Sequence, residues 1–228
     1  MKLENIYCAK FLERKNRFVW KWILNNQEVL FHIADTWRLK ELLFNQNEIL
    51  LQKLDWPRKY KYRLISAKWL QWKFILLNSL LHSKLVREYL VLKNIEFKPE
   101  VVYNDSKLDF LVDNKIYVEV KGCSLIQKIN NEFVWMFPDA PTKRWQKHLK
   151  ELINLIKNWK QAQIWFLLTN NVSFFTPNYK TDPVFSNLFY QFVNLWWSVK
   201  FLYANLNYKK SIVDIFLTEK NVALLKDI

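Results

Sequence analysis

Glycine is almost absent from this chain. Its 228 residues contain a single glycine, Gly122, where average usage would supply about 16. Turns and helix ends that require a left-handed backbone, which glycine adopts most easily, must therefore be built from other residues. The same chain contains 12 tryptophans. Several of them stand where an amphipathic segment is expected to end and a strand to begin.

The placement of these tryptophans suggests a hypothesis about decoding. Trp159 follows Asn158 at the end of one amphipathic segment, and Trp197 follows Trp196 at the end of the next. Helix ends of this kind favour glycine, whereas a bulky residue is strained there. Our hypothesis is that many of these tryptophans are UGA codons that the source organism reads as glycine. The alternative is an AT-rich genome with genuine tryptophans and turns that have drifted.

Cysteine and histidine are also scarce, and long apolar runs are missing. The two cysteines lie far apart and, together with the three histidines, form no zinc pattern, so we expect reduced thiols in a cytoplasmic protein. These residues are Cys8, Cys123, His32, His82 and His148. The first residues are charged and contain no apolar core of a signal peptide. The most apolar window, 187–206, is interrupted by asparagines and Lys200, which argues against a membrane span.

Positive charge, by contrast, is abundant. The formal net charge is +14 and the pI is about 9.6. An excess of this size favours a polyanionic partner, and we predict nucleic acid, with DNA as the first candidate. The alternative is a generically basic protein from a lysine-rich proteome.

Residues 1–80 are predicted to form a small domain of short strands, either a β-barrel or a β-sandwich. Short apolar runs alternate there with charged turns, and no long helical pattern is present. Basic residues alternate with aromatic ones around Arg17, Arg58 and Lys59, an arrangement that can contact phosphates and stack on bases. The alternative is a barrel whose aromatic side chains point inward and whose lysines are merely solvated.

Residues 81–228 are predicted to form a second domain with a mixed α/β sheet and helices on both faces. A helix is expected over 83–94, then a three-stranded meander starting at Pro99, and then a helix capped by Thr142. A strand, a helix and two further strands follow, ending with the segment 212–217.

The stretch from Lys107 to Lys121 carries charges where a sheet interior would hold apolar residues. Two strand-like runs flank a loop of three residues, 113–115. Because side chains alternate between faces, Glu119 and Lys121 share one face, and this loop length places Asp109 directly across from Glu119. A two-residue loop would put Asp109 on the opposite face.

Two neighbouring carboxylates with an ammonium beside them can hold a divalent cation. Asp109 and Glu119 would supply hard oxygen ligands to Mg²⁺ or Mn²⁺. Such a cation activates water and neutralises charge on a phosphate, and Lys121 would position the water or stabilise that charge. Glu88, at the edge of the apolar stripe of the preceding helix, is a candidate accessory ligand. A helix-surface glutamate is, however, more often simply solvated.

A basic helix start follows the hairpin. Lys143, Arg144, Lys147 and Lys150 gather near the first turn of the helix after Thr142. Exposed backbone N–H groups and the helix dipole would add to their attraction for phosphate. We therefore predict Arg144, Lys147 and His148 as nucleic-acid contacts. His148 alone would more often be a packing residue.

The arrangement resembles the PD-(D/E)XK nuclease core, which has the same order of helix, meander, helix and strand. A glutamate on the first helix commonly completes the site in that superfamily, and the resemblance thus implies a role for Glu88. Over nearly its full length the chain also resembles the sugar fermentation stimulation protein family. The matching segments include Asp35–Leu39, which contains Arg38, Tyr117–Lys121 and, most specifically, Phe137–Ala140 with Thr142, Arg144, Lys147–Leu149 and Glu151–Leu152.

The second resemblance implies an N-terminal OB-like barrel joined to a PD-(D/E)XK-type domain. It also implies DNA binding with little sequence preference, a link to sugar-utilisation genes and a DNA/RNA nuclease activity. The family carries glycine at several positions where this chain has tryptophan, namely Trp37, Trp135, Trp145, Trp159 and Trp197. This pattern agrees with the decoding hypothesis and leaves Asp109, Glu119 and Lys121 intact.

Three functions follow from these observations. The first is a metal-dependent nuclease that uses Asp109, Glu119, Lys121 and Glu88. The second is a DNA-binding regulator that keeps a nuclease fold without turnover. The third is an interaction domain whose charge is incidental.

Overall fold

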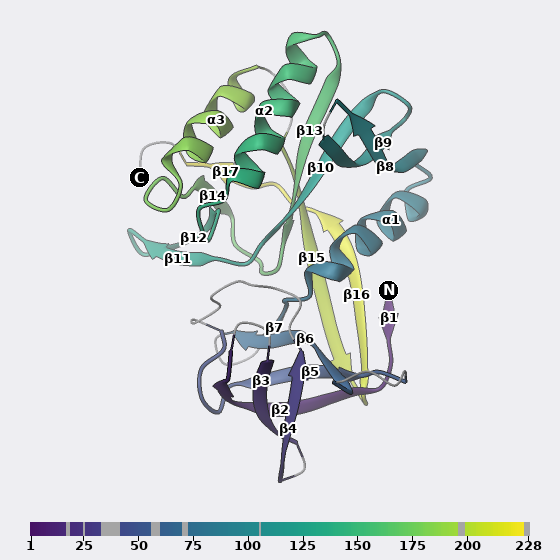
Figure 1. The fold of residues 1–228 in the computed structure, drawn as a ribbon, viewed down its shortest axis with the longest axis vertical. Coiled ribbons are helices and arrows are strands. Elements are labelled where there is room, and N and C mark those ends of the chain that lie inside the picture. Colours follow the sequence, from purple (N-terminus) through teal and green to yellow (C-terminus); the bar gives the residue numbers. More distant parts are fainter. Residues whose placement is uncertain are drawn as a thin grey trace. The chain divides into compact units, whose positions relative to one another are not determined.

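The computed structural model describes residues 1–16, 19–24, 26–32, 42–55, 60–69, 73–104, 106–195 and 199–225. The chain divides into two compact units (Figure 1). The first contains Met1–Leu81 and the returning segment Ala204–Phe216, and the second contains His82–Tyr203 and Leu217–Ile228. The fold is mixed α/β. Within the part of the chain that the structure describes, no helix is both long and apolar enough to cross a membrane.

The first unit is built on a six-stranded sheet with the order β4-β3-β2-β5-β6-β7. A parallel bridge, His32↔Arg63, also joins β4 to β6. The strands are β2 (Ile6–Arg14), β3 (Val19–Leu24), β4 (Gln27–His32), β5 (Glu48–Lys53), β6 (Tyr62–Trp69) and β7 (Lys73–Leu76). Buried and half-buried side chains alternate along β3, as expected of a strand with one face on the core. Trp20, Trp22 and Phe31 fill that core.

Short strands are present in residues 1–80, as predicted, but β2, which lies inside the sheet, was not predicted. β2 pairs with both β3 and β5. Its alternation is hard to recognise because basic residues and Cys8 interrupt the apolar positions. A two-residue strand at the N-terminus, β1 (Lys2–Leu3), pairs with β16 (Ile212–Glu219) at Val213 and Asp214.

The second unit contains the meander predicted from the sequence. The strands β8 (Phe97–Tyr103), β9 (Ser106–Val112) and β10 (Ile116–Cys123) follow helix α1 (His82–Leu92) and pair in antiparallel fashion. β10 then pairs in parallel with β13 (Gln161–Leu168), and β13 with β15 (Val199–Lys209). Helices α2 (Lys143–Lys157) and α3 (Pro183–Asn194) pack against each other in the same unit (Figure 1).

A small second sheet was not predicted. It has the order β11-β12-β14-β17, with β11 (Ile126–Ile129), β12 (Glu132–Phe137), β14 (Phe174–Pro177) and β17 (Ala223–Leu224). Three of its strands have four residues or fewer, too short for a clear period. Phe137, Phe166 and Phe175 are central to the core that lies around it.

Two helix starts differ from expectation. The helix expected over 83–94 begins one residue earlier, at His82, and a turn of 3₁₀-helix over Ser79–Leu81 precedes it. The Asn78 side chain accepts a hydrogen bond from the Leu80 N–H at 3.1 Å. Thr142 is the N-cap of α2, as predicted, but its side chain makes no capping bond. Asp182, the N-cap of α3, instead accepts from Gln146 and from the backbone N–H groups of Thr142 and Phe185.

His82 is buried in the second unit, and its environment makes the stability of the protein depend on pH. Burial lowers the pKa of His82 to about 4, whereas an unfolded histidine titrates near 6.5. Between these values the unfolded chain binds the proton and the folded protein does not. Stability is therefore fully present above about pH 6.5 and falls as the pH drops towards 4, by about 3 kcal/mol in total.

Urea unfolding measured at pH 7 and at pH 4.5 checks this prediction. The wild-type protein should lose more stability over that interval than a His82→Leu variant. Asp109 titrates in the same range but is present in both proteins, so the difference between them isolates His82. Equal losses in the two proteins would contradict the prediction.

Candidate functional site

The hairpin of β9 and β10 has the register expected from the sequence. Val112 pairs with Ile116, and Phe110 with Val118, around the three-residue loop Asp113–Lys115. The paired positions end there, one residue before Asp109 and Glu119, and the Asp109 side chain accepts a hydrogen bond from the Val120 N–H of β10. Asp113 and Asn114 adopt left-handed conformations, with φ of 49° and 55°, a geometry that Asp and Asn tolerate better than most residues.

Glu119 is the buried carboxylate of the site, with 3% of its surface exposed. Its Oε1 accepts hydrogen bonds from Lys121 Nζ and from His148 Nδ1. Because an ionised carboxylate only accepts, His148 must carry its proton on Nδ1. Burial pushes the pKa of Glu119 upward, but Lys121 and His148 outweigh burial and lower it overall. Glu119 is therefore ionised inside the protein.

The second oxygen of the Glu119 carboxylate, Oε2, has a different environment from Oε1. Oε2 of Glu119 is buried and has no hydrogen-bond partner among the residues that the structure describes. A buried ionised oxygen without a partner is costly, since burying charge is tolerated mainly through pairing, hydrogen bonds or metal binding. Glu119 thus presents one satisfied and one unsatisfied oxygen.

Asp109 contributes the second carboxylate. Its Oδ2 accepts a hydrogen bond from the Val120 N–H at 2.7 Å, which fixes the side chain against the strand that carries Glu119. Burial, and next to it the negative charge of Glu119, raise the pKa of Asp109 to about 6. A cation beside Asp109 would relieve the repulsion that Glu119 exerts on its ionised form.

Lys121 is also buried, with 6% of its surface exposed. Burial lowers its pKa, and the attraction of Glu119 opposes this effect. The Lys121 Nζ lies 3.5 Å from the ring centroid of Trp145, so the indole covers the ammonium in a cation–π contact. Trp145 belongs to the first turn of α2, and His148 lies one turn further along the same helix.

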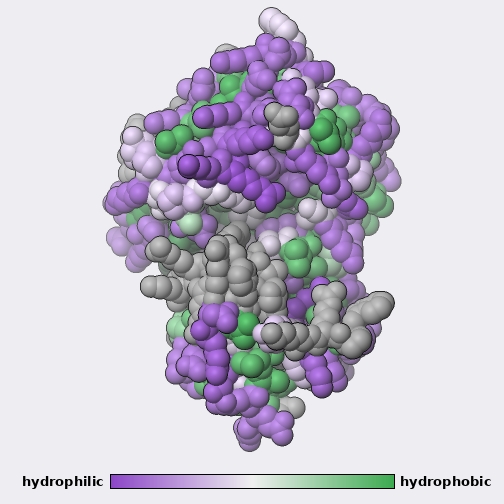
Figure 2. Space-filling model, viewed as in Figure 1, coloured by the Kyte–Doolittle hydropathy of each residue, from purple (hydrophilic) through white to green (hydrophobic). Residues whose placement is uncertain are grey.

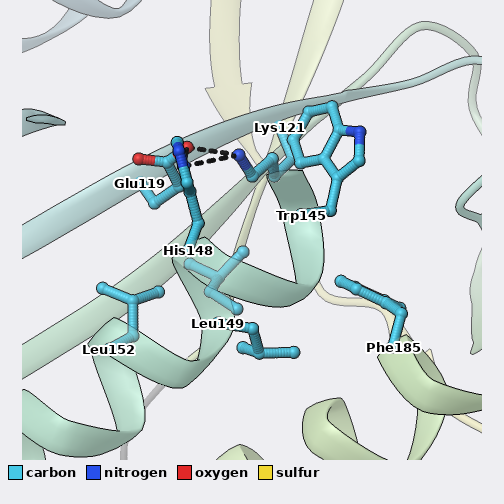
Figure 3. A pocket seen from close by; sticks show the side chains of 8 residues that line it. Glu119, Lys121, Trp145, His148, Leu149, Leu152 and Phe185 are labelled. Carbon is cyan, nitrogen blue, oxygen red and sulfur yellow. Dashed lines mark hydrogen bonds and ion pairs between the residues drawn. The ribbon is translucent and has the colours of Figure 1, made fainter. Parts of the chain in front are cut away.

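Four of these side chains, those of Glu119, Lys121, Trp145 and His148, line one pocket whose floor is apolar (Figure 3). Strand β10 supplies the charged pair, and α2 supplies His148 and Trp145 from the facing side. The remaining lining residues are Leu149, Leu152, Ile164 and Phe185. A polar cluster against an apolar floor is the usual character of a ligand site.

The residues fit a divalent cation in part. Two carboxylates on neighbouring strands, one with an unsatisfied oxygen, are the hard donors that Mg²⁺ and Mn²⁺ prefer. Among the residues that the structure describes, however, no three His, Cys, Asp or Glu side chains converge to hold a metal ion. A cation here would take its further ligands from water or from a phosphate.

The remaining residues that the sequence predicted for the site are not all brought to the carboxylate pair. Glu88 is half-buried in α1 and does not form a three-residue cluster with Asp109 and Glu119. Arg144 and Lys147 are exposed on the first turns of α2, beside the pocket lining. His148, predicted as a nucleic-acid contact, is instead buried against Glu119. Four residues lie outside the described part of the chain: Arg17, Arg38, Arg58 and Lys59.

Sequence reasoning missed two partnerships. Trp145 was considered as a position where the family has glycine, whereas it covers Lys121. His148 was read as facing phosphate, whereas its ring binds the buried carboxylate. The spacing i, i+3 between Trp145 and His148 places both on one helical face. That spacing could have indicated that the two residues act together. Only the contacts of α2 with β10 show that their shared face meets Glu119 and Lys121.

Comparisons with known proteins agree with this description. Residues 74–212 match the family described as "Sugar fermentation stimulation protein RE domain", and residues 12–75 match its "N-terminal OB domain". The chain therefore combines an N-terminal OB domain with an α/β domain of the RE type. It belongs to the sugar fermentation stimulation protein family.

Individual relatives cover most of the chain. A sugar fermentation stimulation protein homolog from Thermosipho melanesiensis is 41% identical over 187 residues, which are 82% of each chain. A homolog from Picrophilus torridus is 38% identical and covers 89% of this chain and 85% of its own length. The solved structure of Pyrococcus furiosus SfsA in complex with Ca²⁺ is 26% identical, covers 98% of both chains and superposes with a TM-score of 0.82.

Proposed function

We propose that this protein binds nucleic acid and hydrolyses phosphodiester bonds with a divalent cation held by Asp109 and Glu119. One observation carries the proposal: Oε2 of Glu119 is buried and unpartnered in a pocket that also contains Lys121. A cation would satisfy this oxygen and stabilise the ionised form of Asp109, whose pKa is raised to about 6.

Two comparisons support a cation at this position. The Pyrococcus furiosus relative is described in complex with Ca²⁺, which prefers the same oxygen donors as Mg²⁺ and Mn²⁺. The order of helix, meander, helix and strand, together with Asp109 and Glu119-Val120-Lys121, also resembles the PD-(D/E)XK nuclease core.

The residues of this chain then have distinct tasks. Asp109 and Glu119 would hold Mg²⁺ or Mn²⁺. When bound, such a cation activates water and neutralises charge on the phosphate. Lys121 places a positive charge at the same pocket, where low polarity strengthens its effect on a developing negative charge. The apolar floor and Trp145 restrict bulk water.

The proposal that the protein binds nucleic acid is based on its positive charge. The net charge is +14, and the start of α2 presents Arg144 and Lys147 beside the pocket. Hydrophilic side chains predominate on the face of the second unit that Figure 2 shows. Phosphates approaching Lys121 would meet these basic side chains first. Arg17, Arg38, Arg58 and Lys59 lie outside the described residues, and we propose from their chemistry alone that they also contact nucleic acid.

Salt dependence tests this interface. Each phosphate that a lysine or arginine neutralises adds about 0.9 to the slope of log K against log [salt] on duplex DNA. An Arg144→Gln/Lys147→Gln variant should lower that slope by up to about 2. Fluorescence anisotropy over a salt series measures it. Lys157→Gln, at the other end of the same helix, is the matched control and should leave the slope unchanged.

Catalysis is tested by incubating the protein with single- and double-stranded DNA and RNA. We expect cleavage with Mg²⁺ or Mn²⁺ and none after addition of EDTA. Binding without cleavage of any substrate under either metal would identify a DNA-binding regulator that keeps the site without turnover. The Trp145 ring over Lys121 is the observation that favours this second function.

A further inference from the structure

His148 differs from the other groups around the candidate cation site, because it belongs to α2 and binds the buried carboxylate from the facing side. Its side chain lies beside Glu119, and its own surface is only 8% exposed. A residue so enclosed cannot lie flat on a nucleic acid. Its Nδ1 contacts Glu119 Oε1 and also lies 3.5 Å from Lys121 Nζ.

The contact decides which oxygen of Glu119 remains available. Oε1 receives Lys121 from the same strand and His148 from α2, while Oε2 receives nothing. A half-turn of the carboxylate only exchanges two equivalent oxygens, whereas any smaller rotation would move the accepting oxygen away from both donors. Two donors from different elements therefore hold the group in one orientation, which a single flexible lysine would not do alone.

We propose that His148 is a positioning residue that orients Glu119 so that Oε2 faces the cation. This inference rests on the proposed function, since it presupposes a cation at Asp109 and Glu119. Residues that hydrogen-bond metal ligands typically change metal affinity by about 10- to 100-fold when they are replaced. His148 should have an effect of this size although it donates nothing to the cation itself.

Titration of Mn²⁺ at constant pH, followed by calorimetry, tests the proposal without any substrate. His148→Phe keeps a ring but removes the donor, and we expect it to weaken Mn²⁺ binding about 10- to 100-fold. His148→Asn keeps a donor and should recover part of the affinity. Thermal melts in EDTA establish that each variant is folded.

The outcomes distinguish failure of the proposed function from failure of the positioning role of His148. Wild-type protein that binds no Mn²⁺ would overturn the proposed function. Wild-type protein that binds Mn²⁺ while folded His148→Phe binds it equally well would overturn the positioning role alone. Equal loss in His148→Phe and His148→Asn would also contradict it, because the donor would then be irrelevant.

A separate observation concerns the end of α2. The Lys160 N–H donates to the Leu155 carbonyl and the Trp159 N–H to the Ile156 carbonyl, both at 3.0 Å. This pair of bonds is the Schellman motif, whose first residue beyond the helix is usually glycine in the left-handed conformation. Trp159 occupies that position with φ of 59°.

Nothing in its surroundings explains a tryptophan there. Its surface is 95% exposed, so the side chain gains no packing in return for the strain. The other non-glycine residues with positive φ in the described chain are Asn, Asp, Gln, Glu, Lys or Ser, and Trp159 is the one aromatic among them. Trp165, in contrast, is buried and its indole N–H donates to Gln163 at 2.7 Å.

We infer that residue 159 is glycine in the protein as its own organism makes it, which requires that the codon be UGA and be read there as glycine. The gene sequence and peptide sequencing of the native protein test this directly. UGA at codon 159 and glycine in the peptide are expected. A UGG codon, or tryptophan in the native peptide, would overturn the inference.

The recombinant protein offers a physical check. Relief of left-handed strain in Trp159→Gly should raise the melting temperature by about 2–4 °C, whereas Trp165→Gly, which empties a buried site, should lower it. An unchanged or lower melting temperature in Trp159→Gly would remove the structural basis of the inference.

Discussion

Replacing Glu119 with glutamine is expected to lower cation-dependent cleavage by at least about 100-fold, since residues that merely support a ligand already account for 10- to 100-fold. Glutamine preserves the size of the side chain but removes the charge that attracts the cation. Initial rates under saturating Mg²⁺, with wild-type protein at equal concentration, measure the effect. Glu132→Gln, at the exposed first position of β12, is the matched control.

Loss of folding must be distinguished from loss of the site. Glu119→Gln leaves the Lys121 ammonium buried without its partner, and breaking such a pair typically costs about 3–5 kcal/mol. A Glu119→Gln/Lys121→Met variant removes both charges and should recover much of that stability, because replacing a whole buried pair is often neutral. It should remain inactive. Cleavage at the wild-type rate by folded Glu119→Gln would contradict the assignment of Glu119.

The second large effect is expected at the single glycine. A Cβ added to Gly122 would lie 2.7 Å from Nδ1 of His82, and closer still to Cε1 of the same ring. The His82 ring is buried, so it has little room to move. Gly122→Ala should therefore reduce the free energy of unfolding by about 1–3 kcal/mol, the usual cost of overpacking. Urea unfolding measures it.

A double-mutant cycle identifies the cause. His82→Ala makes room for the added methyl group, so the Gly122→Ala/His82→Ala protein should be clearly more stable than the sum of the two single effects predicts. Simple additivity would show that the strain at Gly122 lies elsewhere, for example in the backbone of β10.

The hairpin was predictable because its information is local. Strand alternation and a three-residue loop are enough to bring Asp109 to Glu119, and both are visible in 15 consecutive residues. The mixed α/β class and a small N-terminal β-domain were predictable for the same reason, since strand spacing and helix periodicity are local patterns. That this domain is an OB domain was implied only by the family resemblance.

Long-range packing was not predictable from these patterns. The role of His148 depends on which face of α2 meets β10, and the cover over Lys121 depends on the same choice. β2 and the short strands around β12 were missed because basic residues or short length hide their alternation.

Trp145 connects the decoding question to the site. If its codon is also read as glycine, the native protein lacks the ring that covers Lys121, and the pocket between β10 and α2 is more open.

The most direct test of the account is anomalous diffraction from crystals soaked in Mn²⁺. We expect a single strong peak at coordination distance from Glu119 Oε2 and an Asp109 oxygen, with His148 still bound to Oε1. Crystals that diffract well and bind Mn²⁺ only at other positions, or not at all, would contradict the central claim that these two carboxylates form a cation site.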